Sequence, residues 1–192
     1  PSRPQHEFLA DEVWQSAYRR NMIYDHGHHG NAILSRFPIL NAHNQDVTHL
    51  QFEKRGMLHC RIALPNGLVA HCVCVHLSLF GYSRRRQMDA LADYLGDLDE
   101  PDAPLIVAGD FNDWRNRAGE HLACRLGLSE AFSLLPGGRP VRSFPAAMPM
   151  FRLDLIYTRG FTVRSTTVHF GPPWSSISDH AALSALLSQH ES

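Results

Sequence analysis

Leu105-Ile106-Val107-Ala108 passes directly into Gly109-Asp110-Phe111-Asn112-Asp113, so that a short apolar run is followed at once by a polar segment. An apolar run of this length beside glycine and polar residues is typical of a buried β-strand. The polar segment then lies at the end of that strand. Because alternate side chains of an extended chain point the same way, Asp110 and Asn112 are predicted to face a common site.

Three further polar islands follow the same plan, each at the edge of a strand-like apolar segment. His76 ends one such segment, Asp154 lies inside another, and Asp179-His180 precedes a third. Buried strands that deliver Asp, Asn and His to one edge are typical of a hydrolytic metal site rather than of a solvated surface. We therefore expect the four islands to form one site.

The pattern of strands and helices predicts an α/β fold. Helices are predicted at His6–Arg20, from Ser83 as its cap to Leu98, and at His121–Leu126. Strands are predicted at Asn21–Tyr24, Asn31–Ser35, Thr48–Phe52, Met57–Leu64, Leu68–Leu77, Leu105–Ala108, Leu153–Tyr157, Thr162–His169 and Ala181–Leu187. Pro65-Asn66-Gly67 predicts a hairpin turn. Many strands with few helices favour sheets packed on each other with helices outside.

The bulk composition limits the number of domains, the partners and the compartment. With 192 residues, 44% of them hydrophobic, residues 1–192 are predicted to form a single domain. A net charge of −1 gives no general attraction to polyanions, so nucleic-acid binding would need a local basic patch.

No apolar stretch approaches the roughly 20 residues of a membrane-spanning helix. The four cysteines lack Cys-x-x-Cys spacing, which favours a reducing compartment. We expect a cytoplasmic monomer, with a removed leader upstream of Pro1 as the alternative.

Two of the islands indicate defined chemistry, and each has a structural alternative. Asp110 and Asn112 combine a charged acceptor with an amide that donates and accepts, and such a pair can hold an attacking water and a phosphate oxygen. Alternatively, they form an Asx-turn that only ends the strand. A carboxylate at Asp154, with apolar neighbours, requires a partner. We favour His180, which a carboxylate would orient and keep cationic; the alternatives are Arg152 and Arg159.

The remaining polar groups are less specific. Asp179 and His180 point to opposite sides of an extended segment, so one can face a metal while the other faces the scissile bond. A buried, satisfied histidine is the alternative for His76. The histidines His26, His28 and His29 lie in a predicted glycine turn and are interpreted as loop polarity, with an independent Zn²⁺ site as the alternative. The run Arg84-Arg85-Arg86 is interpreted as the solvated start of a helix, with contact to the substrate as the alternative.

Taken in order, the islands resemble the motifs of the endonuclease/exonuclease/phosphatase superfamily, which includes DNase I-like nucleases, sphingomyelinases and inositol-phosphate phosphatases. The resemblance spans essentially the whole chain. Its matching segments are Gly30–Ile39, Lys54–Leu58, His76-Leu77, Arg84 with Gln87, Gly109–Asn112, Ser143-Phe144-Pro145, Arg152–Tyr157 and Ser178–His180. It implies a DNase I-like four-layer α/β/β/α sandwich with the site at one end.

The resemblance also implies a role for each site residue. Asp110 would align the nucleophilic water, and Asn112 would hold the phosphate. His180, oriented by Asp154, would contact the phosphate and handle protons, and His76 would stabilise the transition state. Asp179 would support Mg²⁺, with Mn²⁺ as a substitute, together with Asp110 and Asn112. Substrate contacts are expected from Asn31, Arg84, Phe144 and Trp174.

The function implied by the resemblance is hydrolysis of phosphodiesters by a divalent-metal-dependent phosphoesterase, with a phospholipid or a small molecule as substrate. A DNA endonuclease or exonuclease of the same fold and a non-catalytic, partner-binding member are the alternatives. The superfamily opens with a strand carrying Asn and a strand ending in Gln-Glu, whose Glu is the principal metal ligand. Neither motif precedes His6, and Glu7 and Glu12 lie in a helix-like segment. We therefore expect the domain to lack its first strands and this chain to bind metal weakly.

Overall fold

The computed structural model describes residues 15–24, 27–50, 53–98, 100, 102–114 and 117–189, and its largest unit is a six-stranded sheet. The strand order is β3–β4–β5–β6–β8–β7. The strands are β3 (Ile39–Asp46), β4 (Gly56–Ala63), β5 (Val69–His76), β6 (Leu105–Asp110), β8 (Asp154–Arg159) and the short β7 (Ser129–Glu130). The sheet is mixed, because β5 and β6 are parallel and the other neighbouring strands are antiparallel.

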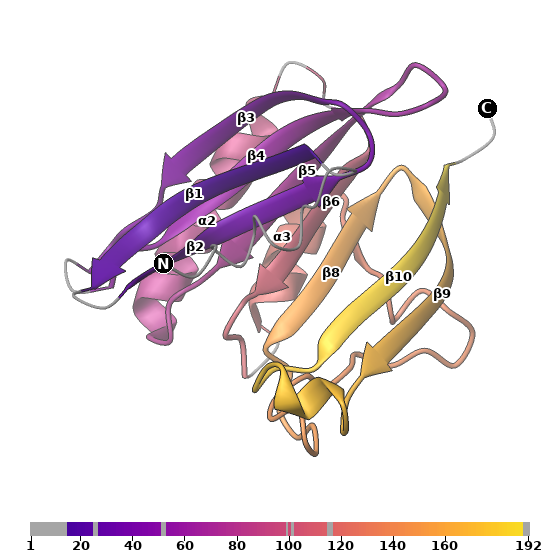
Figure 1. Ribbon diagram of the computed structural model, residues 1–192. Helices are drawn as coiled ribbons and strands as arrows, with labels where there is room; N and C mark the ends of the chain where they lie inside the picture. The colour runs from indigo at the N-terminus through magenta and orange to yellow at the C-terminus, as the bar shows by residue number, and fades with distance from the viewer. Residues whose placement is uncertain are drawn as a thin grey trace.

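Helices and two further strand pairs cover opposite faces of this sheet (Figure 1). The helices α2 (Gly81–Gly96) and α3 (Arg117–Leu126) lie on one face. On the other face, β1 (Gln15–Tyr24) and β2 (Gly27–Ser35) lie over β3 to β5, and β9 (Phe161–His169) and β10 (Ala182–Gln189) pack beside β8. A short 3-10 helix, η1 (Trp174–Ser176), precedes β10. Among the described residues, helices therefore cover one face of the central sheet and strands cover the other.

The alternation of side chains along the strands explains why the central sheet is buried on both faces. Val73 and Val75 of β5 belong to the core that includes Leu91 of α2. Cys72 and Cys74, on the opposite face of the same strand, pack in the core that contains Ala17 of β1. Because successive side chains of a strand alternate, β5 supplies both cores.

The α/β class and most of the predicted strands are confirmed. The hairpin between β4 and β5 turns at Pro65-Asn66-Gly67, where Gly67 has a φ of +86° and Leu64 N–H donates to Leu68 O at 2.8 Å. The helix predicted at His121–Leu126 is the C-terminal part of α3, and Gly127 follows it with a φ of +63°. No helix in the described part of the chain is long and apolar enough to cross a membrane.

The strand predicted at Thr48–Phe52 is wrong for residues 48–50, of which Leu50 forms only an isolated bridge with Glu53, and residues 51 and 52 lie outside the described part of the chain. Residues 47–49 are irregular, and the strand lies earlier, at Ile39–Asp46. This strand, β3, is at the edge of the sheet, and most of its side chains are exposed or only partly buried. Its sequence therefore carries little of the apolar alternation from which a strand is predicted.

The helix predicted at His6–Arg20 is wrong for residues 15–20, which belong to β1 and pair with β2. The residues before Gln15 lie outside the described part of the chain. Here antiparallel pairing with the next strand along the chain overrides the local spacing of apolar residues. His28 and His29 are likewise part of β2 rather than of a glycine turn, and His26 lies outside the described residues.

The predicted cap of α2 is also wrong. The helix begins at Gly81, with Phe80 at the N-cap position and no side-chain cap. Ser83 is buried within the first turn. The start of this helix is fixed instead by the loop that joins it to β5, which is part of the site described below.

Candidate active site

Three side chains stand in a row across the ends of three neighbouring strands. His76 at the end of β5 lies opposite Asp110 at the end of β6, and Asp110 lies opposite Asp154 at the start of β8. Adjacent strands are about 4.8 Å apart, so the strand register alone brings these groups together.

Gly109 allows β6 to place Asp110 in this row. Its φ is +140°, and a Cβ at this position would lie 2.0 Å from Val75 O of β5. Only a residue without a side chain permits such an approach. The position of the Asp110 carboxylate therefore depends on the glycine before it.

Beyond Asp110 the chain turns instead of continuing as a strand. Asn112 N–H donates to Asp110 Oδ1 at 2.8 Å, which is an Asx-turn, and Asn112 has a φ of +50°. The prediction that Asp110 and Asn112 share an extended segment is therefore wrong. The Asn112 side chain is buried, and its Nδ2 donates to Leu77 O at 2.9 Å. The turn thus fixes the amide, and both side chains line one cavity.

The structure brings His180 and Asp154 together. His180 Nδ1 lies 2.7 Å from Asp154 Oδ2, and the His180 N–H donates to Ser178 Oγ at 3.1 Å. The hydrogen bond to Asp154 raises the pKa of His180 against the effect of burial, and the charges of the nearby carboxylates act in the same direction. His180 is therefore an oriented imidazole that favours its cationic form.

Asp110 is the carboxylate whose ionisation is most hindered. Burial, and after it the charge of Asp154, raises the pKa of Asp110 to about 6. The hydrogen bond from Asn112 N–H and the charges of His180 and Arg55 offset part of this effect. Asp110 Oδ2 lies 3.5 Å from His76 Nε2. The row therefore concentrates negative charge that a cation would compensate.

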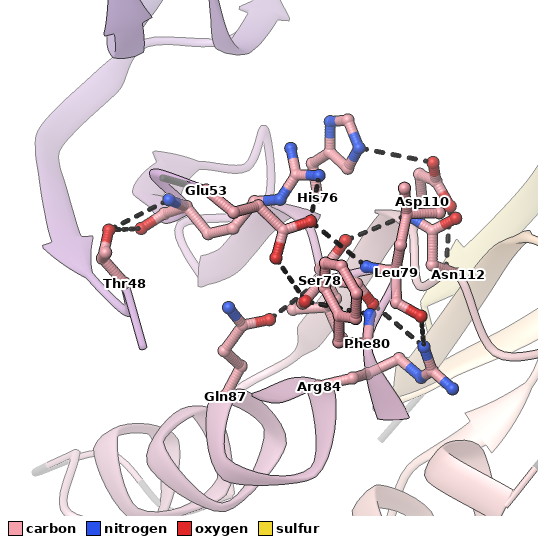
Figure 2. A network of polar contacts seen from close by, with 12 residues as sticks. Thr48, Glu53, His76, Ser78, Leu79, Phe80, Arg84, Gln87, Asp110 and Asn112 are labelled. Atoms are coloured by element: carbon pink, nitrogen blue, oxygen red, sulfur yellow. Dashed lines mark hydrogen bonds and ion pairs between the residues drawn. The ribbon is translucent and has the colours of Figure 1, made fainter. Parts of the chain in front are cut away.

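Arg55 brings a positive charge to the site, and no role was predicted for it. Its side chain is only 8% exposed, and Nη2 donates to Glu53 Oε1 at 2.9 Å. Figure 2 shows that the Glu53 carboxylate also accepts from the Ser78 hydroxyl and, at 3.3 Å, from Leu79 N–H. Ser78 N–H donates in turn to Gln87 Oε1 of α2 at 2.8 Å. This network ties the loop after β5 to both Arg55 and α2.

The network holds Glu53 ionised beside Arg55. Burial opposes the ionisation of Glu53, but the Ser78 hydroxyl, Leu79 N–H and Arg55 together lower its pKa. The Arg55 Nε is buried and has no hydrogen-bond partner among the described residues. Guanidinium groups bind carboxylates and phosphates through two or more N–H donors. Arg55 is therefore anchored by Glu53 and lines the cavity, where its guanidinium is placed to meet an anion. Arg55 lies in Lys54–Leu58, one of the segments that resemble the superfamily, and this was the signal in the sequence that could have identified it.

These groups line one open cavity of about 540 Å³. The lining residues are Arg55, His76, Leu79, Asp110, Asn112, Trp114, Phe144, Leu153, Asp154, Asp179 and His180. The cavity thus gathers every residue predicted to be catalytic or to bind metal, together with Phe144. The sequence prediction missed Arg55, Leu79, Trp114 and Leu153.

Asn31, predicted to contact substrate, lies outside the cavity lining. Its Nδ2 donates to Gly56 O at 2.7 Å and to Cys74 O at 3.1 Å. The side chain is 5% exposed and joins β2 to β4 and β5. Asn31 therefore holds the two sheets together in this structure.

Arg84 and Trp174, also predicted to contact substrate, are not in the cavity lining either. Arg84 Nη1 donates to Ser78 O at 2.9 Å and to Leu79 O at 3.1 Å, so it fixes the loop that carries Leu79. Trp174 packs against His169, with ring centroids 4.8 Å apart. Both residues lie close to segments that do line the cavity.

The chemistry of the lining suits a hard divalent cation. Carboxylates of Asp110 and Asp179 and the amide oxygen of Asn112 are the kind of ligand that Mg²⁺ prefers. Burial, and after it the charge of Asp154, raises the pKa of Asp110, and a cation beside these two carboxylates would favour the ionised form. Among the described residues, no three Asp, Glu, His or Cys side chains are grouped closely enough to hold a metal by themselves. An ion at this site would take further ligands from water and from a bound phosphate, as Mg²⁺ commonly does.

Solved structures share the fold. The catalytic domain of human Nocturnin with a bound sulfate anion has a TM-score of 0.80 and 22% sequence identity, over 96% of this chain and 75% of that chain. D. rerio TDP2 complexed with a single-strand DNA product has a TM-score of 0.74 and 17% identity, over 95% of this chain and 81% of that chain. At these identities the similarity establishes the fold.

Sequence comparison is more specific. The uncharacterized protein YbhP of Escherichia coli (strain K12) is 45% identical over 187 residues, which are 96% of this chain and 73% of that protein. The profile of the Endonuclease/Exonuclease/phosphatase family matches residues 3–180. The chain therefore belongs to the endonuclease/exonuclease/phosphatase family.

Proposed function

We propose that the protein is a divalent-metal-dependent phosphoesterase that hydrolyses phosphodiester bonds by in-line attack of water. The observation that carries this proposal is the row His76–Asp110–Asp154, completed by His180, on a cavity that the Arg55 guanidinium also lines. Carboxylates that can orient water and cations that can bind phosphate face one another there. This combination is what phosphoryl transfer requires.

Each side chain has a task that its surroundings support. Asp110 accepts a hydrogen bond and then a proton from the water as that water bonds to phosphorus, and the fixed amide of Asn112 holds a phosphate oxygen. His180 binds a second phosphate oxygen and donates a proton to the leaving oxygen, with Asp154 holding its orientation. Arg55 and His76 stabilise the charge that develops in the transition state. Mg²⁺ or Mn²⁺, held by Asp179, Asp110 and Asn112 with water, would neutralise the phosphate charge.

A lipid or small-molecule phosphodiester is favoured as the substrate. The net charge of −1 provides no general attraction to DNA, and the cavity itself carries several carboxylates. A DNA endonuclease or exonuclease is the alternative within the family. A non-catalytic, partner-binding role is disfavoured because the acidic, amide and imidazole groups are retained together on one cavity.

Hydrolysis of bis(p-nitrophenyl) phosphate by the full-length protein, with Mg²⁺ or Mn²⁺ and with EDTA, tests the proposal. We expect metal-dependent turnover, slower turnover of p-nitrophenyl phosphate, and a kcat reduced by about 10²-fold or more in His180→Ala and Asp110→Ala. His121→Ala is the matched control, because His121 also pairs with a carboxylate, Asp89, at 2.9 Å but lies on α3. Unchanged rates in both site variants would overturn the assignment.

The substrate class is decided by a second assay on the same preparation. Phospholipid vesicles and soluble small phosphodiesters are compared with plasmid and abasic DNA at moderate salt. We expect hydrolysis of the first group. Robust cutting of DNA that depends on His180 would replace the lipid or small-molecule substrate by nucleic acid.

A further inference from the structure

One side of the cavity mouth carries exposed apolar side chains. Leu79, which lines the cavity, is 56% exposed, and the neighbouring Phe80 and Tyr82 are 53% and 67% exposed. These three residues, called the Leu79 lip, lie between β5 and the first turn of α2. Three exposed apolar residues of this size within four positions form a patch that is unusual on a solvated surface.

The other side of the mouth is also apolar. Trp114 lines the cavity and packs against Phe151, with ring centroids 4.9 Å apart. The segments around Phe151 and Asp179 are joined by a hydrogen bond from Ala146 N–H to Asp179 O at 2.7 Å. The loops that precede β8 and β10 supply Phe144 and Asp179 to the cavity lining. The large exposed apolar side chains at residues 144–151 and 170–177 of these two loops, called the Ile177 lip, are Met148, Met150, Phe151, Phe170, Trp174 and Ile177.

Arginines stand immediately beside the Leu79 lip. The Arg84 guanidinium donates to Leu79 O at 3.1 Å (Figure 2), and Arg86 donates to the Tyr82 hydroxyl at 3.1 Å with its guanidinium 5.6 Å from the ring centroid. Arg85 is exposed between them. The lip is therefore an apolar ridge backed by three consecutive cations.

We propose that the two lips dock this protein on an anionic phospholipid surface, so that the phosphodiester of a lipid headgroup enters the cavity. The inference rests on the proposed function and names the substrate surface for it. Aromatic and aliphatic side chains insert into the headgroup and upper acyl region, and neighbouring arginines bind anionic lipids. Aliphatic residues such as Leu79 and Ile177 favour a lipid surface over single-stranded nucleic acid, which binds by stacking on aromatic rings.

Sedimentation of the full-length protein with vesicles tests the docking. Phosphatidylcholine vesicles with and without phosphatidylglycerol are compared for the wild type, for the double variant Phe80→Ser/Tyr82→Ser, and for Arg85→Glu. We expect the wild type to prefer the anionic vesicles, the double variant to bind them at least about tenfold more weakly, and Arg85→Glu to lose the preference.

Two matched variants at other positions serve as controls. Leu68→Ser removes a side chain that is 48% exposed at the far end of β5, and Arg164→Glu reverses an exposed charge on β9. Both should bind vesicles like the wild type. Equal binding by the wild type and the double variant, or equal losses in the control variants, would overturn the proposal. Nucleic acid would replace the lipid surface if the wild type binds no vesicles but binds a single-stranded oligonucleotide, and the double variant loses that binding.

Hydrolysis of soluble bis(p-nitrophenyl) phosphate separates this proposal from the proposed function. The residues Phe80, Tyr82 and Arg85 do not line the cavity, so their variants should hydrolyse the soluble substrate at the wild-type rate. Vesicle binding without any hydrolysis would support docking and contradict the enzymatic function. Hydrolysis of the soluble substrate without vesicle binding would contradict docking alone.

Discussion

At the scale of single residues, the charge of His180 depends on one carboxylate. Its hydrogen bond to Asp154 is the largest cause of its raised pKa, and its ring also packs near Phe144, with centroids 5.0 Å apart. An imidazole that is both cationic and fixed can bind a phosphate oxygen and donate a proton to a leaving group. Asp154 therefore acts on the reaction through His180.

Asp154→Asn should lower the pKa of His180. The variant removes the charged acceptor and leaves burial, which opposes protonation, so the imidazole loses its proton at a lower pH than in the wild type. An NMR titration of the imidazole resonances measures the shift. Asp89→Asn, which removes the surface partner of His121, is the control and should leave His180 unchanged. Identical His180 titrations in the wild type and Asp154→Asn would contradict this reasoning.

Arg55→Ala should weaken substrate binding, which is measured as a rise in KM. Arg55 is the arginine among the cavity-lining residues, and its loss removes donors for the phosphate, so KM is expected to rise about tenfold or more. Glu53 keeps its contacts with Ser78 and Leu79 N–H. Arg61→Ala is the control, because Arg61 also pairs with a glutamate, Glu100, away from the cavity. Equal KM values for Arg55→Ala and the wild type would remove Arg55 from the site.

At the scale of elements, the end of β6 is the most constrained part of the site. Gly109 combines an unfavourable φ with contact against the β5 backbone, whereas Gly67 has a positive φ with nothing within 4 Å of an added Cβ. The two glycines therefore separate the cost of backbone conformation from the cost of a steric clash.

Gly109→Ala should destabilise the protein by roughly 3 kcal/mol or more, because the added Cβ meets Val75 O and forces β5 and β6 apart. Gly67→Ala should cost only about 1 kcal/mol, the conformational term alone. Urea unfolding of both variants measures the difference. Similar losses in the two variants would show that close packing at Gly109 is relieved by small backbone shifts.

Elements with a strong local signal could be predicted from the sequence. β5, β6, β8 and β10 combine apolar runs with turn residues at their ends, and the Asn-Gly turn fixes the β4–β5 hairpin. β3 and β1 could not be predicted correctly, because each is stabilised by pairing with the next strand along the chain, and the side chains of β3 show little burial alternation.

The site residues divide in the same way. Asp110, Asp154 and His180 could be predicted because an ionisable residue beside a buried strand requires a partner. Arg55 lies in a segment of the resemblance, but its role could not be predicted, since only the fold places it near Glu53 and the β5 loop. Asn31 is predicted to contact the substrate, but its side-chain amide donates hydrogen bonds to two backbone carbonyls. This role could not be predicted, because it depends on how the sheets stack.

At the scale of the whole molecule, a chain of polar groups around two buried histidines, His59 and His71, links the central sheet to its helical layer. His59 Nδ1 lies 2.8 Å from the Tyr94 hydroxyl of α2, and His59 Nε2 lies 2.9 Å from His71 Nδ1. His71 Nε2 lies 3.2 Å from Glu100 Oε2. Burial, and after it the charge of His71, lowers the pKa of His59 to about 4.

The contribution of His59 to the free energy of unfolding should therefore fall as the pH is lowered from about 6.5 to about 4, whereas the raised pKa of Asp110 contributes in the opposite direction in the same range. In this range the unfolded chain protonates His59 and the folded protein does not, so the contribution is complete above about pH 6.5 and is lost below it, by roughly 1–2 kcal/mol. Urea unfolding at several pH values measures the slope. His59→Gln retains hydrogen-bonding groups without a titrating ring and should show a shallower slope. Parallel slopes for both proteins would contradict the assignment to His59.

The row across β5, β6 and β8 has a consequence for how such a protein can diverge. The positions of His76, Asp110 and Asp154 are set by hydrogen-bonded strand register, and a slip of one residue would turn each side chain to the opposite face. In the described part of the chain, the lips lie outside the strands of the central sheet, and their residues make at most an isolated bridge, between Phe144 and Phe151. Mutations in the lips can therefore change the substrate specificity while the reacting groups keep their spacing. Substrate specificity and catalytic chemistry can thus change independently of each other.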